Sequence, residues 1–511
     1  MVWTSATNNG AAADVIMSSH RLLEGLQRIL INVRDVCATE ATQAGLIVDE
    51  LLLREQLPSL RHHYAAGYQL VRSRFESHAA ETQRLAAYVE LFSGLPALLS
   101  EESNWQSCRE QIGRLMECAS AIAESTSYPT QADKAFDTVV SELLAWEVRG
   151  YRFAEVPTAA APETKLAISA EHVRNALREI PGYEDASITS FEPLLGGVSK
   201  VTIGFEALSA RQGKERFVLR GESLLPILDQ VYLGMELANE YNLLHYLHRA
   251  GAPVAEVIAL VDDRRLAPGR FFVSRWIPGR PPGDYLLRVN SVSPALSARV
   301  ATILADLHNI PVDLKDPDLA RTHLVRTGAK TREDAVREFV LRAHAYWKSS
   351  GAPASPMIST AVRWLLENVP ASSKAACIIH SDCGLNNFLV KEDEISAVVD
   401  WETARLGDPA EDVVWFMFAT GHVLDQDHFL RSYVQAGGER VNAFTRKYFE
   451  VLARVRVLFA QVDVQIKYER VPSANVILCA MALGQADKTV ADLDAAIRAA
   501  DEVKRQSSTR S

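Results

Sequence analysis

The stretch that decides the fold of this 511-residue chain reads Cys377-Ile-Ile-His380-Ser-Asp382-Cys-Gly-Leu-Asn-Asn387-Phe-Leu-Val390. Its two short apolar runs are typical of buried strands, and they enclose a polar turn through Gly384. A third apolar run, Ile395–Val399, leads into Asp400-Trp-Glu402. Because side chains on such a loop point to one place, we expect the three polar groups Asp382, Asn387 and Asp400 to converge.

The residue types on this predicted loop suit phosphoryl transfer. The Asp382 carboxylate would accept or orient the proton of an attacking hydroxyl, and Asn387 and Asp400 would hold Mg²⁺ through oxygen atoms. Phosphoryl transfer requires mainly that the protein position the reactants and stabilise charge, so few side chains suffice. We expect His380 to support the loop through a hydrogen bond rather than to transfer a proton.

Two motifs follow the loop in order, Asp400-Trp-Glu402 and Gly407-Asp408-Pro-Ala-Glu-Asp412. Together with the His-x-Asp-x(4)-Asn run they resemble the aminoglycoside and choline phosphotransferase family, relatives of the protein kinases. The resemblance implies an α+β, protein-kinase-like fold of two lobes, and ATP and Mg²⁺ as cofactors. Asp408 and Asp412 have a second interpretation, since Gly-Asp-Pro favours a turn and an Asp before Val413 favours a helix N-cap.

A β-rich, nucleotide-binding N-lobe is expected over residues 167–283. Its strand patterns enclose Gly196-Gly197-Val-Ser199. Paired glycines let backbone N–H groups approach phosphate oxygens, and Ser199 adds a hydroxyl donor, so we expect this loop to cover the ATP phosphates. The alternative is a plain hairpin turn, and the loop departs from the kinase Gly-x-Gly-x-x-Gly pattern.

The next apolar strand, Phe217-Val-Leu-Arg220-Gly, carries an arginine where kinases place a lysine. Arginine binds phosphate and carboxylate bidentately, so Arg220 is expected to hold the ATP phosphates, with Glu240 on an amphipathic helix as its orienting partner. The alternative for Arg220 is a solvent-facing charge at a strand end. Val-Leu-Arg at this strand is similar to the kinase-like domains fused to acyl-CoA dehydrogenases.

The resemblance also implies a hinge and a helical C-lobe. Main-chain groups of Arg275 and Ile277, after the strand that follows Gly269, would contact the purine. The C-lobe, residues 284–511, would hold the catalytic loop and the acceptor pocket. Apolar residues at helical spacing predict its helices at 293–309, 335–349, 359–367, 429–436, 443–468 and 473–500.

Residues 1–152 differ from the rest, because their apolar spacing predicts five or six successive amphipathic helices. We expect an accessory helical bundle, joined by an Ala/Thr/Pro-rich linker over 153–166. Nothing in the bundle carries chemistry. It is a candidate for homodimerisation, for shaping the acceptor site, or for binding a partner protein.

Composition restricts the classes of function. The chain is 48% hydrophobic and 23% charged, with a net charge of −10 and no basic run, which argues against a nucleic-acid surface. No secretion signal or membrane-spanning run is evident. Six dispersed cysteines suit reduced thiols and a cytoplasmic location. Cys383 lies inside the loop motif, but direct in-line transfer needs no cysteine nucleophile.

The sequence thus predicts an ATP- and Mg²⁺-dependent phosphotransferase acting on the hydroxyl of a small molecule. The acyl-CoA-dehydrogenase resemblance implies a hydroxyacyl-CoA or similar catabolic alcohol. Alternatives are an aminoglycoside- or choline-type kinase, and a catalytically silent kinase-like binding or scaffold protein. Protein substrates are disfavoured, because no Ala-Pro-Glu activation segment follows Asp400.

Overall fold

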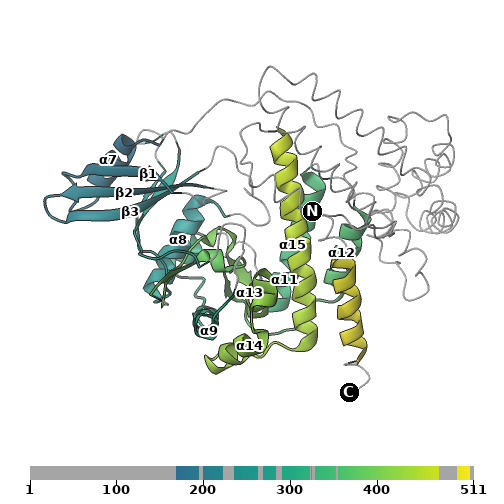
Figure 1. Cartoon of the computed structure of the whole chain (residues 1–511). Coiled ribbons are helices and arrows are strands. Elements are labelled where there is room, and N and C mark those ends of the chain that lie inside the picture. The colour runs from purple at the N-terminus through teal and green to yellow at the C-terminus, as the bar shows by residue number, and fades with distance from the viewer. Residues whose placement is uncertain are drawn as a thin grey trace, which may run out of the picture. The chain divides into compact units, whose positions relative to one another are not determined.

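A computed structural model describes residues 168–506, except 195–199, 223–234, 263–266, 268, 283–290, 323, 325–328, 351, 353–354, 393 and 471–491. The predicted bundle, the linker, and the loop residues Gly196, Gly197 and Ser199 lie outside the described residues. The described part contains both helices and strands, in agreement with the predicted α+β class (Figure 1).

The described residues separate into two compact units. The first contains residues up to 346, together with 368–453 and 500–506, and it includes every predicted site residue that is described. The second contains 347–367 and the described part of 454–499, and in it the rings of Trp347 and Phe459 pack 4.7 Å apart. In the described residues, no helix is long and apolar enough to cross a membrane.

The N-terminal part of the first unit is a five-stranded antiparallel sheet in the order β1-β2-β3-β5-β4. Helix α7 precedes the sheet, and α8 connects β3 to β4. The predicted strand at Arg220 and the predicted helix at Glu240 both form, and the strand begins four residues earlier than the apolar run from Phe217 indicated. The bounds are α7 Ala170–Arg178, β1 Ser187–Pro193, β2 Val201–Ser209, β3 Gly213–Gly221, α8 Leu237–Arg249, β4 Val257–Val261 and β5 Phe271–Arg275.

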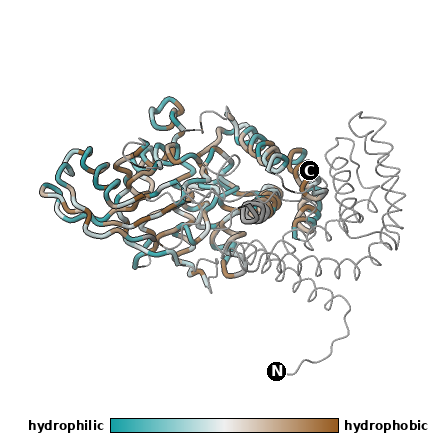
Figure 2. The backbone as a smooth tube through the Cα atoms, turned by 90° about the horizontal axis from the view of Figure 1, so that it is seen from above, coloured by the Kyte–Doolittle hydropathy of each residue, from teal (hydrophilic) through white to brown (hydrophobic). Residues whose placement is uncertain are grey.

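The two faces of this sheet pack against different helices. Phe205 and Phe217 are cross-strand partners with ring centroids 5.3 Å apart, and they share a buried cluster with Leu177 of α7. Phe272 points the other way and belongs to the cluster that contains Leu243 of α8. Because strand side chains alternate between faces, hydrophobic and hydrophilic residues are interspersed along the chain here (Figure 2).

The rest of the first unit is mainly helical. Helices α9, α11, α12, α14 and α15 agree with the predicted segments to within about four residues at each end, whereas α10 and α13 were not among those segments. Ser293 caps α9 by accepting a hydrogen bond from the Leu296 amide. The bounds in both units are α9 Pro294–His308, α10 Pro317–Ala320, α11 Arg332–Ser349, α12 Pro356–Glu367, β6 Cys377–Ile379, η3 Leu385–Asn387, β7 Phe388–Lys391, β8 Glu394–Val398, η4 Trp401–Thr403, β9 Arg405–Gly407, α13 Pro409–Thr420, η5 Gly421–Val423, α14 Gln426–Gln435 and α15 Ala443–Arg470. Of the predicted helix 473–500, only residues from 492 onward are described, and they are helical to 506.

The segment after β5 is fastened to the hairpin β7–β8. Arg280 and Val390 exchange two backbone hydrogen bonds of 3.0 and 2.9 Å, and the Ser396 hydroxyl donates to the Pro278 carbonyl at 2.7 Å. Gly279 has φ of 144°, and a Cβ there would meet Leu389 and Ser396, so the close approach requires glycine. The sheet and the helical part are therefore joined beside the candidate site.

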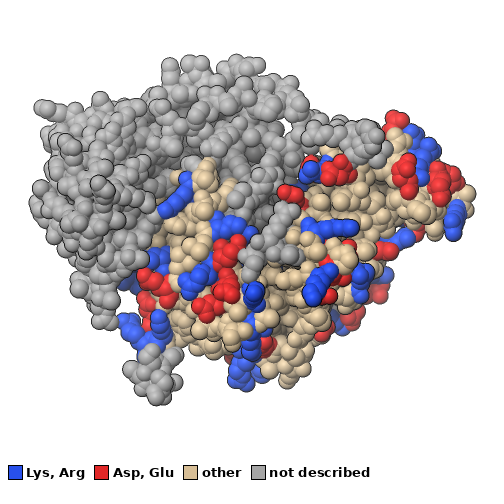
Figure 3. All heavy atoms as spheres, turned by 180° about the vertical axis from the view of Figure 1, so that it is seen from behind, with Lys and Arg blue, Asp and Glu red and all other residues tan. Residues whose placement is uncertain are grey.

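An ion-pair cluster on the surface gives a test of the fold by pH. Acidic and basic residues are interspersed on the face in Figure 3. In the cluster, Glu439 accepts hydrogen bonds from Arg332 at 2.7 Å and Lys374 at 2.5 Å, and these contacts lower the pKa of Glu439 to about 2. A carboxyl group whose pKa is lower in the folded than in the unfolded protein stabilises the fold at pH values above its unfolded pKa. This stabilisation is lost as the pH falls through the folded-state pKa.

We expect Glu439→Gln to lower the free energy of unfolding at pH 7 by up to about 1 kcal/mol, because Glu439 is partly exposed to screening solvent. The difference from wild type should shrink as the pH falls from about 4.5 to about 2. Urea titrations at several pH values measure it. Glu192→Gln, at an exposed position in β1, is the matched control, and a constant difference at every pH would contradict the assignment.

Candidate active site

The predicted loop forms around a 3-10 turn. After β6 the backbone passes through Ser381 in the left-handed region, with φ of 68°, and Asn387 ends η3. The Asn387 side-chain amide donates to the Asp382 backbone carbonyl at 2.7 Å and to the Asp382 carboxylate at 3.2 Å. Two of the three predicted residues are thus in direct contact.

Asp400 is held against the same loop by its neighbour Val399. The Val399 amide donates to the Asn387 carbonyl at 2.9 Å, and the Val399 carbonyl accepts from the His380 ring at 2.9 Å. Asp400 itself has φ of 68° and is the N-cap of η4, two residues after β8 ends. Its side chain keeps 35% of its surface exposed, so the carboxylate is open to a ligand.

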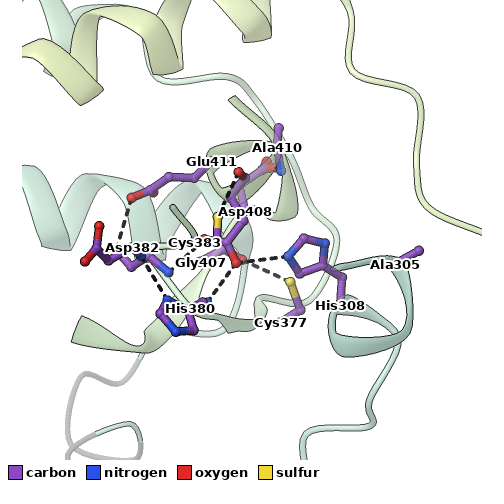
Figure 4. Close-up of polar contacts among 12 residues, drawn as sticks. Ala305, His308, Cys377, His380, Asp382, Cys383, Gly407, Asp408, Ala410 and Glu411 are labelled. Carbon is purple, nitrogen blue, oxygen red and sulfur yellow. Dashed lines mark hydrogen bonds and ion pairs between the residues drawn. The ribbon is translucent and has the colours of Figure 1, made fainter. Parts of the chain in front are cut away.

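His380 is fixed by backbone groups on both sides of its ring. The Asp382 amide donates to Nδ1 at 3.2 Å, so Nδ1 is the acceptor (Figure 4). Nε2 then carries the proton that is donated to the Val399 carbonyl. This tautomer is assigned from the hydrogen bonds. The two contacts tie Asp382 to the segment before Asp400, which is what the predicted supporting role of His380 requires.

Arg220 lies in a buried cluster of three carboxylates. Its guanidinium contacts Glu240 at 2.9 Å, Asp400 at 2.5 Å and Glu402 at 3.0 Å, and only 14% of its side chain is exposed. The predicted Arg220–Glu240 pair therefore forms, and the solvent-facing alternative is wrong. Glu402 was not predicted as a partner, although it lies in the motif that follows the loop.

The three carboxylates favour the charged form of Arg220. Burial disfavours the charged guanidinium, but Glu240, Asp400 and Glu402 outweigh that cost and raise the pKa of Arg220 above its usual value. Burial also raises the pKa of the Glu240 carboxyl, and Arg220 opposes that rise. Arg220 therefore stays charged and links β3, α8 and the segment after β8.

Asp408 and Asp412 have different places in α13. Asp408 is the N-cap and accepts from the Ala410 amide at 2.8 Å. The N-cap interpretation of Asp412 is wrong, because the helix begins at Pro409 and Asp412 lies inside it. The buried Asp412 carboxylate accepts instead from the backbone amides of His380 and Ser381, both at 2.7 Å.

A chain of side chains supports Asp412 from the far side. The His308 Nε2 lies 3.2 Å from Asp412, and its Nδ1 lies 2.8 Å from the Tyr433 hydroxyl. Burial alone would favour the neutral acid, but the hydrogen bonds from the His308 ring and the His380 amide favour the carboxylate, and the pKa of Asp412 is lowered. His308 and Tyr433 come from α9 and α14, and no local pattern had marked them as loop supports.

The two loop cysteines are buried and inert. Burial raises the pKa of both the Cys377 and the Cys383 thiols, and Cys383 donates to the Asp412 carbonyl at 3.0 Å. A thiol with a raised pKa forms little thiolate, which is the nucleophilic species. The geometry supports the expectation that Cys383 is not a nucleophile.

Two backbone amides of the predicted hinge are hydrogen-bonded within the sheet region. The Arg275 amide donates to the Glu256 carbonyl at 2.9 Å, and the Trp276 amide donates to the Arg216 carbonyl at 3.0 Å. The Arg275 side chain pairs with Glu215 at 2.5 Å and Glu256 at 2.8 Å. The Arg275 amide is thus engaged within the sheet, and Ile277 carries the next amide that could meet a purine.

A profile of the phosphotransferase enzyme family matches residues 210–451. The match includes Arg220, Glu240, the loop from His380 to Asn387, and Asp400. Residues 210–451 form a phosphotransferase-family domain.

Curated relatives of the phosphotransferase-family domain have a long additional part. Acyl-CoA dehydrogenase family member 11 of Mus musculus is 28% identical over 207 residues, which are 40% of this chain and 25% of that protein. The same protein of Homo sapiens is 28% identical over 217 residues, with the same coverage of 40% and 25%. The match thus spans about a quarter of the length of these relatives.

Solved structures similar to this chain include a thermostable mutant of aminoglycoside phosphotransferase APH(4)-Ia in ternary complex with AMP-PNP and hygromycin B. It is 18% identical, with a TM-score of 0.42, and the comparison covers 65% of this chain and 99% of that chain.

The phosphotransferase-family domain can be tested for a magnesium site through its donor atoms. No group of three or more His, Cys, Asp or Glu side chains suited to a metal occurs among the described residues. Mg²⁺ at phosphate sites usually takes only one or two carboxylates and completes its shell with phosphate and water. The Asp400 carboxylate and the Asn387 amide oxygen, joined through the Val399 backbone, fit that requirement.

Proposed function

We propose that this chain is an ATP- and Mg²⁺-dependent phosphotransferase that acts on the hydroxyl of a small molecule. The observation that carries the proposal is the grouping of three polar residues beside the Arg220–Glu240 pair, all within a phosphotransferase-family domain. Asn387 is hydrogen-bonded to Asp382, and Asp400 is held by Arg220 and, through its neighbour Val399, beside Asn387. A scaffold protein would need neither a paired carboxylate and amide nor a buried arginine beside them.

Each residue has a role that follows from its contacts. Asp382 accepts or orients the proton of the acceptor hydroxyl, since its carboxylate is positioned by Asn387. Asn387 and Asp400 would hold Mg²⁺, which supplies positive charge to the transferring phosphoryl group. Arg220, oriented by Glu240, keeps Asp400 in place and faces the phosphates.

The remaining contacts to ATP follow from position along the chain. Residues Gly196, Gly197 and Ser199 would cover the phosphates through backbone and hydroxyl donors. Ile277, and Arg275 through its carbonyl, would contact the purine. In this proposal residues 167–283 are the nucleotide-binding N-lobe and 284–511 are the C-lobe with the acceptor pocket, as in the protein kinases.

The proposed acceptor is a hydroxyacyl-CoA or a similar catabolic alcohol. Support comes from the curated relatives, which are named acyl-CoA dehydrogenases and contain a matching segment over a quarter of their length. An aminoglycoside- or choline-type acceptor is the second candidate. We further propose that the protein works in the cytoplasm and that residues 1–152 mediate homodimerisation.

The test is a survey of acceptors. Purified protein is incubated with ATP and Mg²⁺, and ADP release is followed with hydroxyacyl-CoAs, aminoglycosides, choline and sugars, against reactions without acceptor and with EDTA. We expect acceptor-dependent release with a hydroxyacyl-CoA that EDTA abolishes. Nucleotide binding without turnover on any acceptor would contradict the proposal and favour a binding protein.

A further inference from the structure

Lys200 is an unusual lysine because it is buried. Only 8% of its surface is exposed, and it is the residue immediately before β2. Lysine is almost never fully buried unless its charge is compensated. Its environment therefore contains opposite charge.

The strand register shows which face Lys200 occupies. Thr202 is the cross-strand partner of Arg220, and cross-strand partners point to the same side of a sheet. Lys200 precedes Thr202 by two residues, so alternation places it on that same side. The intervening Val201 and the next odd-numbered residues, Ile203 and Phe205, pack in the opposite cluster with α7.

Electrostatics point to the same location independently of the register. The positive charge of Lys200 acts to lower the pKa of the buried Glu240 carboxyl, which is the carboxylate that binds Arg220. Such an interaction is strong only at short range, since it falls with distance and dielectric screening. Lys200 and Arg220 are thus two cations that both act on the Glu240 carboxylate.

The two cations differ in the shape and number of their donor groups. The contacts of the Arg220 guanidinium go to three carboxylates, those of Glu240, Asp400 and Glu402. With two cations and three carboxylates, the cluster has a formal charge of −1. An ammonium group is a compact charge on a flexible chain with three donors, so one donor can contact a carboxylate while another contacts a phosphate.

We propose that Lys200 is the cation that binds the nucleotide phosphates, and that Arg220 is mainly a positioning residue for Asp400 and Glu240. The inference rests on the proposed function, because it concerns the same nucleotide site. Without Lys200 the cluster charge would be −2, which would repel phosphate more strongly. The lysine that kinases place on β3 would then have its counterpart here at the start of β2.

Calorimetric titration of Lys200→Met with ATP, ADP and adenosine, each with Mg²⁺ and with EDTA, tests this role. We expect ATP and ADP to bind about 10- to 100-fold more weakly than to wild type, as loss of a charge-assisted hydrogen bond predicts. Adenosine, which has no phosphate, should bind equally to both. Lys214→Met is the matched control, because Lys214 is exposed on β3 and pairs with Glu206.

The outcomes separate this inference from the proposed function. Wild-type protein that fails to bind ATP would overturn both. Wild-type binding that is equal in Lys200→Met would overturn the role of Lys200 alone, and so would a parallel loss of adenosine binding, which indicates a structural role. If Lys200→Met lacks a cooperative unfolding transition, Lys200→Gln takes its place, because it keeps a polar side chain without the charge. Its affinities for ATP, ADP and adenosine relative to wild type are then compared in the same way.

Discussion

Replacing Asp382 with asparagine is expected to lower acceptor-dependent kcat by about 10²- to 10⁴-fold, the usual contribution of a general base. The amide has nearly the same shape as the carboxylate, and its oxygen can still accept the hydrogen bond from Asn387. The variant should therefore fold and bind ATP as wild type does. The change removes only the group that accepts or orients the proton of the acceptor hydroxyl.

Steady-state rates of ADP release measure the effect, with ATP affinity measured separately by calorimetry. Asp427→Asn is the matched control, since Asp427 is exposed in the first turn of α14. It should leave both quantities unchanged. Turnover of Asp382→Asn near the wild-type rate would remove Asp382 from its proposed role, and a loss of ATP binding would show that Asp382 is needed for the fold of the site.

The catalytic loop could be predicted from sequence because its functional residues lie close together along the chain. Asp382 and Asn387 lie five residues apart on one turn, so any compact loop brings them together, and the apolar runs on both sides indicated the strands β6 and β7. The Arg220–Glu240 pair was predictable only through the resemblance to kinases. Their contact joins a strand to a helix twenty residues later.

The supports from distant elements had no comparable signal. His308 and Tyr433 reach the loop from α9 and α14, and their patterns indicated only amphipathic helices. Lys200 could have been assigned to the Arg220 face from alternation, but no local pattern indicated that it is buried. Sequence patterns of this kind fix periodicity within an element and leave open which elements meet.

Asp412→Ala should have the largest effect on stability, because it removes a buried acceptor of two backbone amides. The Asp412 side chain is fully buried, and its loss leaves the His380 and Ser381 amides and His308 without their partner. Breaking such a buried charged contact costs about 3–5 kcal/mol. Catalysis should fall as well, because these amides hold the backbone that presents Asp382.

Asp408→Ala is the matched control, with the same substitution four residues earlier in the same helix. Asp408 caps α13 through one backbone amide, and loss of a cap costs about 0.5–2 kcal/mol. Urea titrations of both variants at pH 7 give the comparison. Equal losses would mean that Asp412 acts merely as a helix-terminal residue.

The dependence on pH separates the two explanations further. The lowered pKa of Asp412 means that its contribution is present above the ordinary carboxyl pKa, about 4, and fades as the pH falls through the lower folded-state value. The stability gap between wild type and Asp412→Ala should thus narrow in acid. If the gap narrows and the loss exceeds that of Asp408→Ala, the conformation of the catalytic loop depends on a carboxylate from α13, which lies outside the loop motif itself.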